Sequence, residues 1–487
     1  MRVGVIGGGA AGTSVLDALV RRHDGRRPIE VTVFEADKQY GPGRAYQADS
    51  SAALVNQPAR HMSLRHDQPD HFLAWYRARA PLPADPDFYV PRTLFGEYLE
   101  SSFHQAVEDG AAVSVRVRTV GERVVALSRS GAGFLARTPA GEAHPLDAAF
   151  LCTGSSEPVD SYGLAGLPGF LPDPYPLRTV ADTIRPDAAV SVLGTGLSAV
   201  DLVLELARRD HRGPLRMVSR NGLLPGVRNP AVSVPTLVAT PSEIRTLAAR
   251  PGGLTVAALG DLVARELAAH GLDPAAVLRA CRVEAQPYDR LRRHLDAAER
   301  GERWQAVLAQ ITGDSQIEDA WSLLAEPDRR HFQRDWHAMA VSLWSPMPLD
   351  SARTLAELVE AGRLEILRGV RSASPHPDRA GFLLQGEEFT HAADHVVNTV
   401  RPLSAAVPLR AVELMDSLVA GGLARPHRFG GLRIDLATNR VLAPDGTPTP
   451  GLYALGQPAV GELHAATSNL SMISRRAAQS VAGLLGR

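Results

Sequence analysis

Two stretches of sequence decide the fold: Arg2-Val-Gly-Val-Ile-Gly-Gly-Gly-Ala-Ala-Gly12 and Ala189-Val-Ser-Val-Leu-Gly-Thr-Gly-Leu-Ser-Ala199. Each begins with a short apolar run that is typical of a buried parallel strand. Each then runs into a helical pattern, over residues 13–22 and 199–209. The turns between strand and helix carry a G-x-G-x-x-G pattern at Gly7, Gly9 and Gly12, and a G-x-G-x-x-A pattern at Gly194, Gly196 and Ala199.

Turns of this kind bind the pyrophosphate of a dinucleotide. The first glycine permits a tight turn, the second lets the backbone approach the phosphates, and the third position allows the helix to pack closely on the strand. The amino end of the helix then offers N–H groups and a positive dipole to the phosphates. Because this strand–turn–helix context occurs twice, the sequence predicts an α/β protein with two Rossmann-like dinucleotide-binding domains.

The two predicted sites differ at the residue that faces the ribose. After the first turn, a strand over residues 30–34 ends at Glu35, where a carboxylate accepts hydrogen bonds from a ribose. After the second turn, a strand over residues 215–218 is followed by Ser219 and Arg220, and an arginine there can pair with a ribose phosphate. We therefore predict FAD at the first site and NADPH, in preference to NADH, at the second; a solvated surface arginine is the alternative for Arg220. The predicted NADPH contacts are Gly194, Gly196, Ser198, Ala199, Ser219 and Arg220.

The pattern along the chain predicts that each domain is interrupted. We expect FAD-binding segments at residues 1–165 and 406–487, NADPH-binding segments at 177–240 and 346–405, and a helical insertion at 241–345. Strands are expected over residues 123–127, 148–154 and 395–399, the last two ending in small-residue turns. The proline-rich residues 168–176 are expected to be a linker, and residues 317–341 one long helix of the insertion.

Composition narrows the class of protein. The chain has 487 residues, 45% of them hydrophobic, and a formal net charge of −1, which gives no electrostatic reason to expect nucleic-acid binding. No apolar stretch approaches the roughly 20 residues of a membrane-spanning helix, so we expect a cytoplasmic protein that does not bind membranes. Cys152 and Cys281 are the only cysteines and form no C-x-x-C motif, so neither a redox disulfide nor a metal site is predicted.

Several further motifs resemble those of a known family. They are Gly41-Pro-Gly-Arg-Ala-Tyr46, Asn56-Gln-Pro58, Arg60-His-Met-Ser63, Phe72-Leu-Ala-Trp75 and Pro91-Arg-Thr-Leu-Phe-Gly96. Together with the first turn they resemble the bacterial FAD/NAD(P)-binding flavoproteins, and the overall plan is similar to the class B flavin monooxygenases, which include amino-acid N-hydroxylases and an aspartate N-oxygenase. The resemblance covers nearly the whole chain and is specific over about the first hundred residues.

The resemblance implies a set of FAD contacts. Gly7, Gly9, Ala10, Ala11, Gly12 and Glu35 would hold the pyrophosphate and ribose, Thr153 and Gly154 would pass beneath them, and the backbone of Val124 would meet the adenine. Arg44 would pair with the pyrophosphate or with a substrate carboxylate. His61 and Met62 would lie along the flavin, with packing as their alternative role. Gly456, Gln457, Thr467, Ser468 and Leu470 would lie at the flavin pyrimidine edge, with helix capping as the alternative for residues 467–469.

The predicted catalytic side chains are the amides of Asn56, Gln57 and Asn469, which would hold a peroxyflavin; a simple turn is the alternative for residues 56–58. The implied function is an FAD-dependent, NADPH-consuming monooxygenase that uses O2 to oxygenate a small nucleophile, the nitrogen of an amine or amino acid in a natural-product pathway. Arg228, Arg334 and Arg353 are candidates for a substrate carboxylate. The chain is also a candidate homo-oligomer.

Two other functions stay open. The first is an NAD(P)H-dependent flavin reductase or oxidase without oxygen transfer. The second is a non-enzymatic sensor or assembly factor that holds FAD as a structural ligand. The second turn argues against the sensor, because a bound NADPH has little purpose without hydride transfer.

Overall fold

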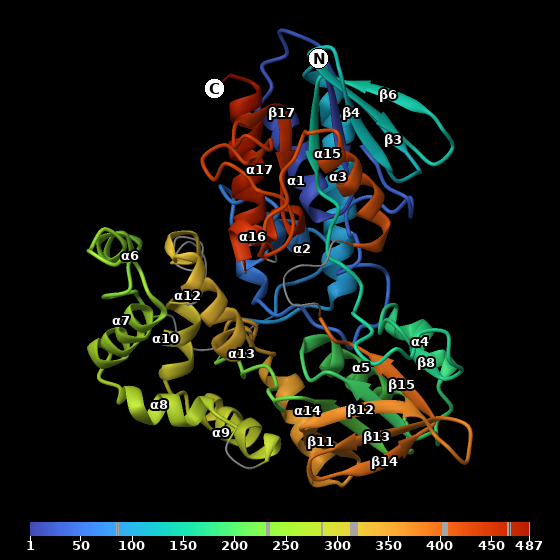
Figure 1. Ribbon diagram of the computed structural model, residues 1–487, viewed down its shortest axis with the longest axis vertical. Helices are drawn as coiled ribbons and strands as arrows, with labels where there is room; N and C mark the ends of the chain where they lie inside the picture. Colours follow the sequence, from blue (N-terminus) through green and yellow to red (C-terminus); the bar gives the residue numbers. More distant parts are fainter. Residues whose placement is uncertain are drawn as a thin grey trace. The chain divides into compact units, whose positions relative to one another are not determined.

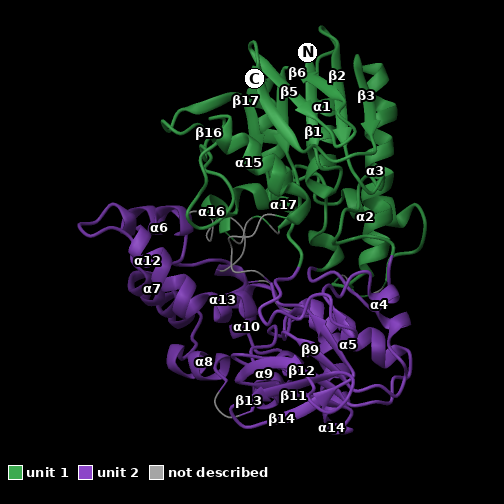
Figure 2. Cartoon of the chain, turned by 45° about the vertical axis from the view of Figure 1, so that its right-hand side comes forward, with its two compact units in different colours: residues 1–48, 58–157, 402–487 green, residues 49–57, 158–401 purple. Residues whose placement is uncertain are grey.

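The computed structural model describes residues 1–83, 85, 87–229, 234–283, 286–311, 320–401, 408–464, 467 and 469–486. The chain divides into two compact units, coloured green and purple in Figure 2. Unit 1 contains residues 1–48, 58–157 and 402–487, and unit 2 contains residues 49–57 and 158–401. The expected α/β architecture with two dinucleotide-binding folds is confirmed.

Unit 1 is built on a six-stranded sheet in the order β16-β17-β7-β1-β2-β3. The strands are β1 (Arg2–Ile6), β2 (Ile29–Phe34), β3 (Val115–Val120), β7 (Ala148–Leu151), β16 (Arg440–Leu442) and β17 (Pro448–Ala454). All neighbours pair in parallel except β16, which runs antiparallel to β17. The order reverses at β1, which lies between β2 and β7, so the first glycine turn leaves the sheet at the switch point where ligands bind in such folds.

Alternate residues of this sheet enter two different cores. Val3 and Val5 pack with α1 (Ala10–Arg22), α3 (Arg92–Ala112) and α17 (Leu470–Leu484). Ile6 and Phe34 pack on the other face with α15 (Val412–Ala420) and a three-stranded antiparallel sheet. That small sheet consists of β4 (Ala126–Ser130), β5 (Gly133–Arg137) and β6 (Ala143–Leu146). Shorter elements complete the unit: η1 (Ala59–His61), α2 (His71–Arg77), η3 (Leu409–Ala411), η4 (Gln457–Ala459) and α16 (Val460–Leu463).

Unit 2 repeats the plan on a five-stranded parallel sheet in the order β11-β10-β9-β15-β8. Figure 1 labels β8, β11 and β15 of this sheet. The strands are β8 (Phe170–Leu171), β9 (Val190–Leu193), β10 (Leu215–Ser219), β11 (Leu364–Arg368) and β15 (His395–Asn398). One face is covered by α4 (Leu177–Thr183), α5 (Leu197–Arg208) and α14 (Leu349–Glu360), and the other by β12 (Val370–Pro375), β13 (Phe382–Gly386) and β14 (Thr390–Ala393). The second glycine turn follows β9, which is again the strand at which the order reverses.

Residues 241–344 are helical wherever the structure describes them as regular. The helices are α6 (Pro241–Ala248), α7 (Val256–Ala269), α8 (Pro274–Cys281), α9 (Pro287–Glu299), α10 (Trp304–Ile311), α12 (Glu326–His331), the π-helical turn η2 (Phe332–Trp336) and α13 (His337–Trp344). The single helix expected over residues 317–341 is wrong for its described part. Proline sits in the first turn of α12, where it starts a helix and cannot continue one, and Leu324 pairs with Leu254 just before it.

Two further expectations need correction. The proline-rich segment 168–176 contains the edge strand β8, because Phe170 is buried in the core beneath β13 and a two-residue edge strand tolerates flanking prolines. The strand expected at residue 123 begins at Ala126, because Ala126 pairs with Arg137, which is the last residue of β5.

The borders of the units also differ from the expected domains. Residues 49–57 pack with unit 2, where the carboxylate of Asp49 accepts the N–H groups of Leu177 and Arg178 at 2.6 and 2.9 Å. Ser50 donates to the buried Glu205, and Ala53 lies in the core of the same unit.

Candidate functional site

The first glycine turn is shaped so that side chains are excluded from it. Gly7 has φ +108° and a Cβ there would lie 2.1 Å from the carbonyl oxygen of Cys152. A Cβ on Gly12 would lie 2.0 Å from the carbonyl oxygen of Gly7, and one on Gly9 would lie 3.2 Å from the Cα of Gly43. Gly9 caps α1 without a side chain, so the first turn of the helix, with Ala10 and Ala11, presents backbone to an incoming group. This is the cradle that a pyrophosphate requires.

Glu35 is tied to the same turn. Its Oε2 accepts the N–H of Gly8 at 2.9 Å, while Oε1 accepts the N–H of Asp37 at 3.4 Å. The half-buried carboxylate at the end of β2 is therefore held beside the glycines, where an adenosine ribose would reach it.

Thr153 and Gly154 follow the end of β7, the strand next to β1 in the sheet. The Oγ1 of Thr153 is buried and has no hydrogen-bond partner among the described residues. Since an unpaired buried hydroxyl is costly, it is poised for a polar group that the protein chain itself does not provide. Gly154 follows with φ +75°, and a Cβ there would meet nothing within 4 Å. An orphaned donor and an open glycine at the carboxyl end of the sheet fit a bound dinucleotide.

The turn after β17 brings together residues from two stretches. Gly456 has φ +69°, and Gln457 donates from Nε2 to Oγ1 of Thr467 at 3.1 Å. Asn469 caps α17 by accepting the N–H of Met472 at 3.3 Å, with the buried Leu470 next to it. The capping role is thus observed for Asn469, and contact of this turn with the flavin stays a prediction. Ser468 lies outside the described residues.

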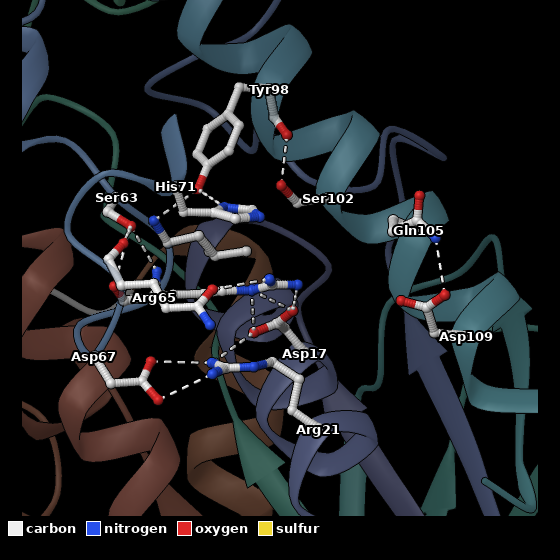
Figure 3. Close-up of polar contacts among 12 residues, drawn as sticks. Asp17, Arg21, Ser63, Arg65, Asp67, His71, Tyr98, Ser102, Gln105 and Asp109 are labelled. Atoms are coloured by element: carbon white, nitrogen blue, oxygen red, sulfur yellow. Dashed lines mark hydrogen bonds and ion pairs between the residues drawn. The ribbon is translucent and has the colours of Figure 1, made fainter. Parts of the chain in front are cut away.

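The loop that carries His61 and Met62 is anchored by an ion-pair network (Figure 3). Asp17 is buried in α1, and Arg65 approaches its carboxylate at 2.8 Å through Nη2 and at 3.1 Å through Nε. Arg21 holds Asp67 with two hydrogen bonds of 3.0 and 2.9 Å. These contacts fix the loop against the helix that starts at the glycine turn.

A second anchor ties the loop to α3. The hydroxyl of Tyr98 accepts the N–H of Leu64 at 3.0 Å and contacts Nδ1 of His71 at 2.7 Å (Figure 3). Burial raises the pKa of Tyr98 to about 12 and lowers the pKa of His71 to about 4, so both groups are neutral at pH 7. Within this loop Met62 is buried, and the exposed His61 accepts from Arg60.

The anchoring residues Asp17, Arg65, His71 and Tyr98 are absent from the predicted site. One signal in the sequence could have revealed them: Asp17 interrupts the apolar run Val15-Leu-Asp-Ala-Leu-Val20 of a buried helix. A charge in that position needs a partner, because a buried carboxylate without one is strongly unfavourable.

The remaining predicted FAD residues lie in three different parts of the chain. Val124 is buried in the core beside β4. Arg44 is half-buried and donates from Nη1 to the carbonyl oxygen of Ser156 at 3.2 Å, which places it beside the end of β7. Asn56 and Gln57 are half-buried in the segment that packs with unit 2, so the structure does not group them with the first glycine turn.

The second glycine turn leaves more open space than the first. Gly194 has φ +112°, and a Cβ there would lie 2.4 Å from Oγ1 of Thr399. Gly196 is exposed at the start of α5, and a Cβ there would meet nothing within 4 Å. Ser198 lies 3.3 Å from the hydroxyl of Tyr175, and Ala199 is fully buried where the helix meets the sheet. Tyr175 also donates to Asp201 at 2.8 Å, a contact absent from the predicted site.

Ser219 and Arg220 lie at the end of β10. The Oγ of Ser219 accepts from Oγ1 of Thr195 at 3.1 Å and from the N–H of Gly222 at 3.0 Å, so this hydroxyl is held by the turn itself. Arg220 is exposed and has no carboxylate partner among the described residues. Burial raises the pKa of the nearby Tyr162 phenol, and the charge of Arg220 opposes that rise. An arginine free of acids at this place suits an anionic ligand.

The three arginines proposed for a substrate carboxylate differ in their surroundings. Arg334 pairs with Asp335, and Arg353 pairs with Glu299 and Asp350; both arginines are exposed. The backbone N–H of Arg228 donates to Met347, and its side chain is half-buried. Cys152 and Cys281 are buried free thiols; burial raises the pKa of Cys152 well above its usual range and that of Cys281 to about 11.

The protein thus contains two parallel sheets, each with a glycine turn at the strand where the strand order reverses. In agreement, residues 4–156 match the model of a family described as FAD-NAD(P)-binding. No helix of the described chain has the length and apolar character needed to cross a bilayer.

Solved structures of similar architecture extend the comparison to the whole chain. The reduced form of an ornithine hydroxylase from Pseudomonas aeruginosa has a TM-score of 0.59 at 14% identity, covering 100% of this chain and 98% of that one. The ornithine N-hydroxylase of Kutzneria sp. 744, solved with reduced FAD, NADP+ and L-ornithine, has a TM-score of 0.58 at 16% identity, covering 100% and 99%. L-lysine 6-monooxygenase of Pseudomonas syringae has a TM-score of 0.57 at 16% identity, with the same coverage. No curated protein matches the sequence. At these identities the likeness is one of fold.

Proposed function

We propose that this chain is an FAD-dependent, NADPH-consuming monooxygenase that oxygenates the nitrogen of a small amine or amino acid. The observation that carries the proposal is the pair of glycine turns, each at the switch point of its own parallel sheet. One dinucleotide-binding turn would suit many enzymes, whereas two in one chain suit the transfer of electrons from a nicotinamide to a flavin. The N-hydroxylating enzymes named above share this architecture over the full length of the chain.

We assign FAD to unit 1 and NADPH to unit 2. In unit 1, Gly7, Gly9, Gly12 and Thr153 would hold the pyrophosphate, and Glu35 would accept the ribose hydroxyls. In unit 2, the open backbone at Gly196 would face the pyrophosphate of NADPH, and Arg220 would pair with its ribose phosphate.

Bound FAD would supply the hydride-accepting and oxygen-activating chemistry, and the protein positions the reactants and excludes water. The loop over residues 59–66 is suited to that work, because Arg65 and Tyr98 hold it rigidly against α1 and α3. An amine substrate must be neutral to act as a nucleophile, so its site must disfavour the ammonium ion through desolvation or nearby positive charge.

The test begins with the flavin content of the purified protein and its anaerobic reduction by NADPH. The reduced protein is then mixed rapidly with oxygenated buffer and followed by absorbance. A transient species that is neither reduced nor oxidised flavin, together with an N-hydroxylated product from a panel of amines and amino acids, supports the proposal. Stoichiometric hydrogen peroxide with every substrate, without such a species, supports the flavin reductase or oxidase instead. Absence of bound FAD after reconstitution contradicts both.

A further inference from the structure

Residues 409–413 of unit 1 are tied to three separate stretches of the first site. The N–H of Leu409 donates to Oε2 of Glu157 at 3.0 Å. Arg410 donates from Nη1 to Oδ2 of Asp37 at 2.6 Å, and its Nε lies 4.0 Å from Oε1 of Glu157. Arg123 donates to the carbonyl oxygen of Arg410 at 3.2 Å and pairs with Glu413 at 2.9 Å.

These three stretches adjoin residues that we predict to meet the adenosine half of FAD. Asp37 lies two residues beyond Glu35, Arg123 precedes Val124, and Glu157 lies three residues beyond Gly154. Apolar packing also anchors the segment, because Ala411 and Val124 are buried in the same core. A piece of chain from about 250 residues downstream of Glu157 therefore joins all three walls of the predicted adenosine site.

The positive charge of Arg410 lies among three acidic side chains. Glu35, Asp37 and Glu157 are acids, and all three raise the pKa of Arg410, with the hydrogen bond to Asp37 as the largest cause. The carboxylates would repel the negatively charged pyrophosphate of FAD unless a nearby cation offsets their charge. Arg410 is that cation, because its guanidinium contacts Asp37 and approaches Glu157.

We propose that residues 409–413 form a clamp at the adenosine end of the FAD site, with Arg410 as the positioning residue that holds Asp37 and Glu157 beside Glu35. The inference rests on the assignment of FAD to unit 1. An isolated exposed ion pair contributes little to stability, and Arg410 and Asp37 are 49% and 63% exposed. The clamp differs from such a pair because backbone groups of Leu409 and Arg410 also take part.

The test compares the rate of FAD release from wild type and from Arg410→Ala, measured by flavin fluorescence with a scavenger of free FAD in excess. We expect release to be about fivefold to tenfold faster in the variant, and Arg410→Lys to restore part of the wild-type rate. ADP affinity for the apoprotein, measured by calorimetry, should fall in parallel, while the unfolding temperature of the apoprotein stays unchanged. Arg2→Ala is the matched control, because it breaks another exposed arginine–aspartate pair of unit 1, with Asp147.

Each outcome decides the matter. Release within twofold of wild type, or unchanged ADP affinity with a lowered unfolding temperature of the apoprotein, would overturn the clamp. If Arg410→Ala does not fold, Asp37→Asn is read by the same criteria. A wild-type protein that cannot bind FAD contradicts the proposed function itself, whereas a wild type that retains FAD beside an unaffected variant contradicts the clamp alone.

Discussion

At the scale of single residues, the two glycine turns are under different constraints. In the first, Gly12 faces a carbonyl oxygen so closely that a methyl group would disrupt the protein itself. In the second, Gly196 has φ −80° and ψ −175°, which any residue adopts, and open space where a Cβ would be. The protein alone therefore does not require glycine at 196, and the proposed NADPH gives the residue a reason.

This difference yields a sharp prediction. Gly196→Ala should fold with an unchanged unfolding temperature, while its KM for NADPH rises at least about tenfold, because the methyl group occupies the path of the pyrophosphate. Gly12→Ala should instead lower the unfolding temperature and the yield of folded protein. Calorimetry and steady-state kinetics measure both, and an unchanged KM in Gly196→Ala would remove the pyrophosphate from this turn.

Arg220 is predicted to select the phosphorylated cofactor. Arg220→Ala should weaken NADPH binding by about tenfold or more and leave NADH binding almost unchanged, because a charge-assisted pair to a phosphate contributes about 1.5–3 kcal/mol. The ratio of the two KM values measures the effect. Equal losses for both cofactors would assign Arg220 to a general surface role.

At the scale of elements, the loop over residues 59–66 depends on a buried charge. Its ion pair joins Arg65, whose side chain is 17% exposed, to Asp17, which is 5% exposed. The sequence does not reveal this link, because the partners are 48 residues apart and neither belongs to a motif. The strands and helices on either side of each glycine turn were predictable, since their periodicity is local.

We predict that Arg65→Ala lowers the free energy of unfolding by about 3 kcal/mol, because it leaves the Asp17 carboxylate buried with Arg21 as a weaker partner at 3.7 Å. Urea unfolding measures the change. Arg2→Ala, which removes an exposed arginine, should leave the midpoint where it is. An equally small effect of both variants would show that solvent reaches Asp17.

His71 gives this element a pH dependence. Its pKa is lowered to about 4 by burial, so the unfolded chain, with the ordinary value of 6.5, takes up a proton first. Stability should therefore fall as the pH drops from about 6.5 to about 4, by about 1 kcal/mol once screening of the half-buried ring is allowed for. Protonation also removes Nδ1 as the acceptor for Tyr98. The free energy of unfolding is measured at several pH values for wild type and for His71→Gln. The variant should lack this part of the dependence of stability on pH.

At the scale of the whole molecule, the sequence predicted two nucleotide-binding folds, because each glycine turn with its flanking strand and helix indicates such a fold. It also predicted the helical insertion. It did not predict the three-stranded sheets that cover one face of each parallel sheet, since their short strands lack a distinctive pattern. The sequence also did not predict that residues 49–57 pack with unit 2. That placement depends on Asp49 capping a helix 128 residues away, a contact that no local pattern encodes.

The two units have separate hydrophobic cores, which predicts two thermal transitions. Unit 1 and unit 2 each bury their own apolar clusters, so calorimetry should resolve one transition for each. FAD at 100 times its Kd should stabilise the first by about 2.7 kcal/mol, and NADP+ at the same ratio the second. Gly196→Ala should lose the response to NADP+ and retain the response to FAD. If both ligands move the same transition, the assignment of one cofactor to each unit is wrong.

The late position of β17 and α17 in the sequence has a consequence for synthesis on the ribosome. Val15, Leu16 and Leu19 of the first helix are covered by Ala477, Ala478 and Val481, and β17 is the neighbour of β7 in the sheet. All of unit 2 is therefore translated before α17, which covers the apolar side of α1, has been made. Until residues 448–484 emerge, this apolar surface of α1 lacks its cover, so we expect the proposed FAD site to be complete only at the end of synthesis.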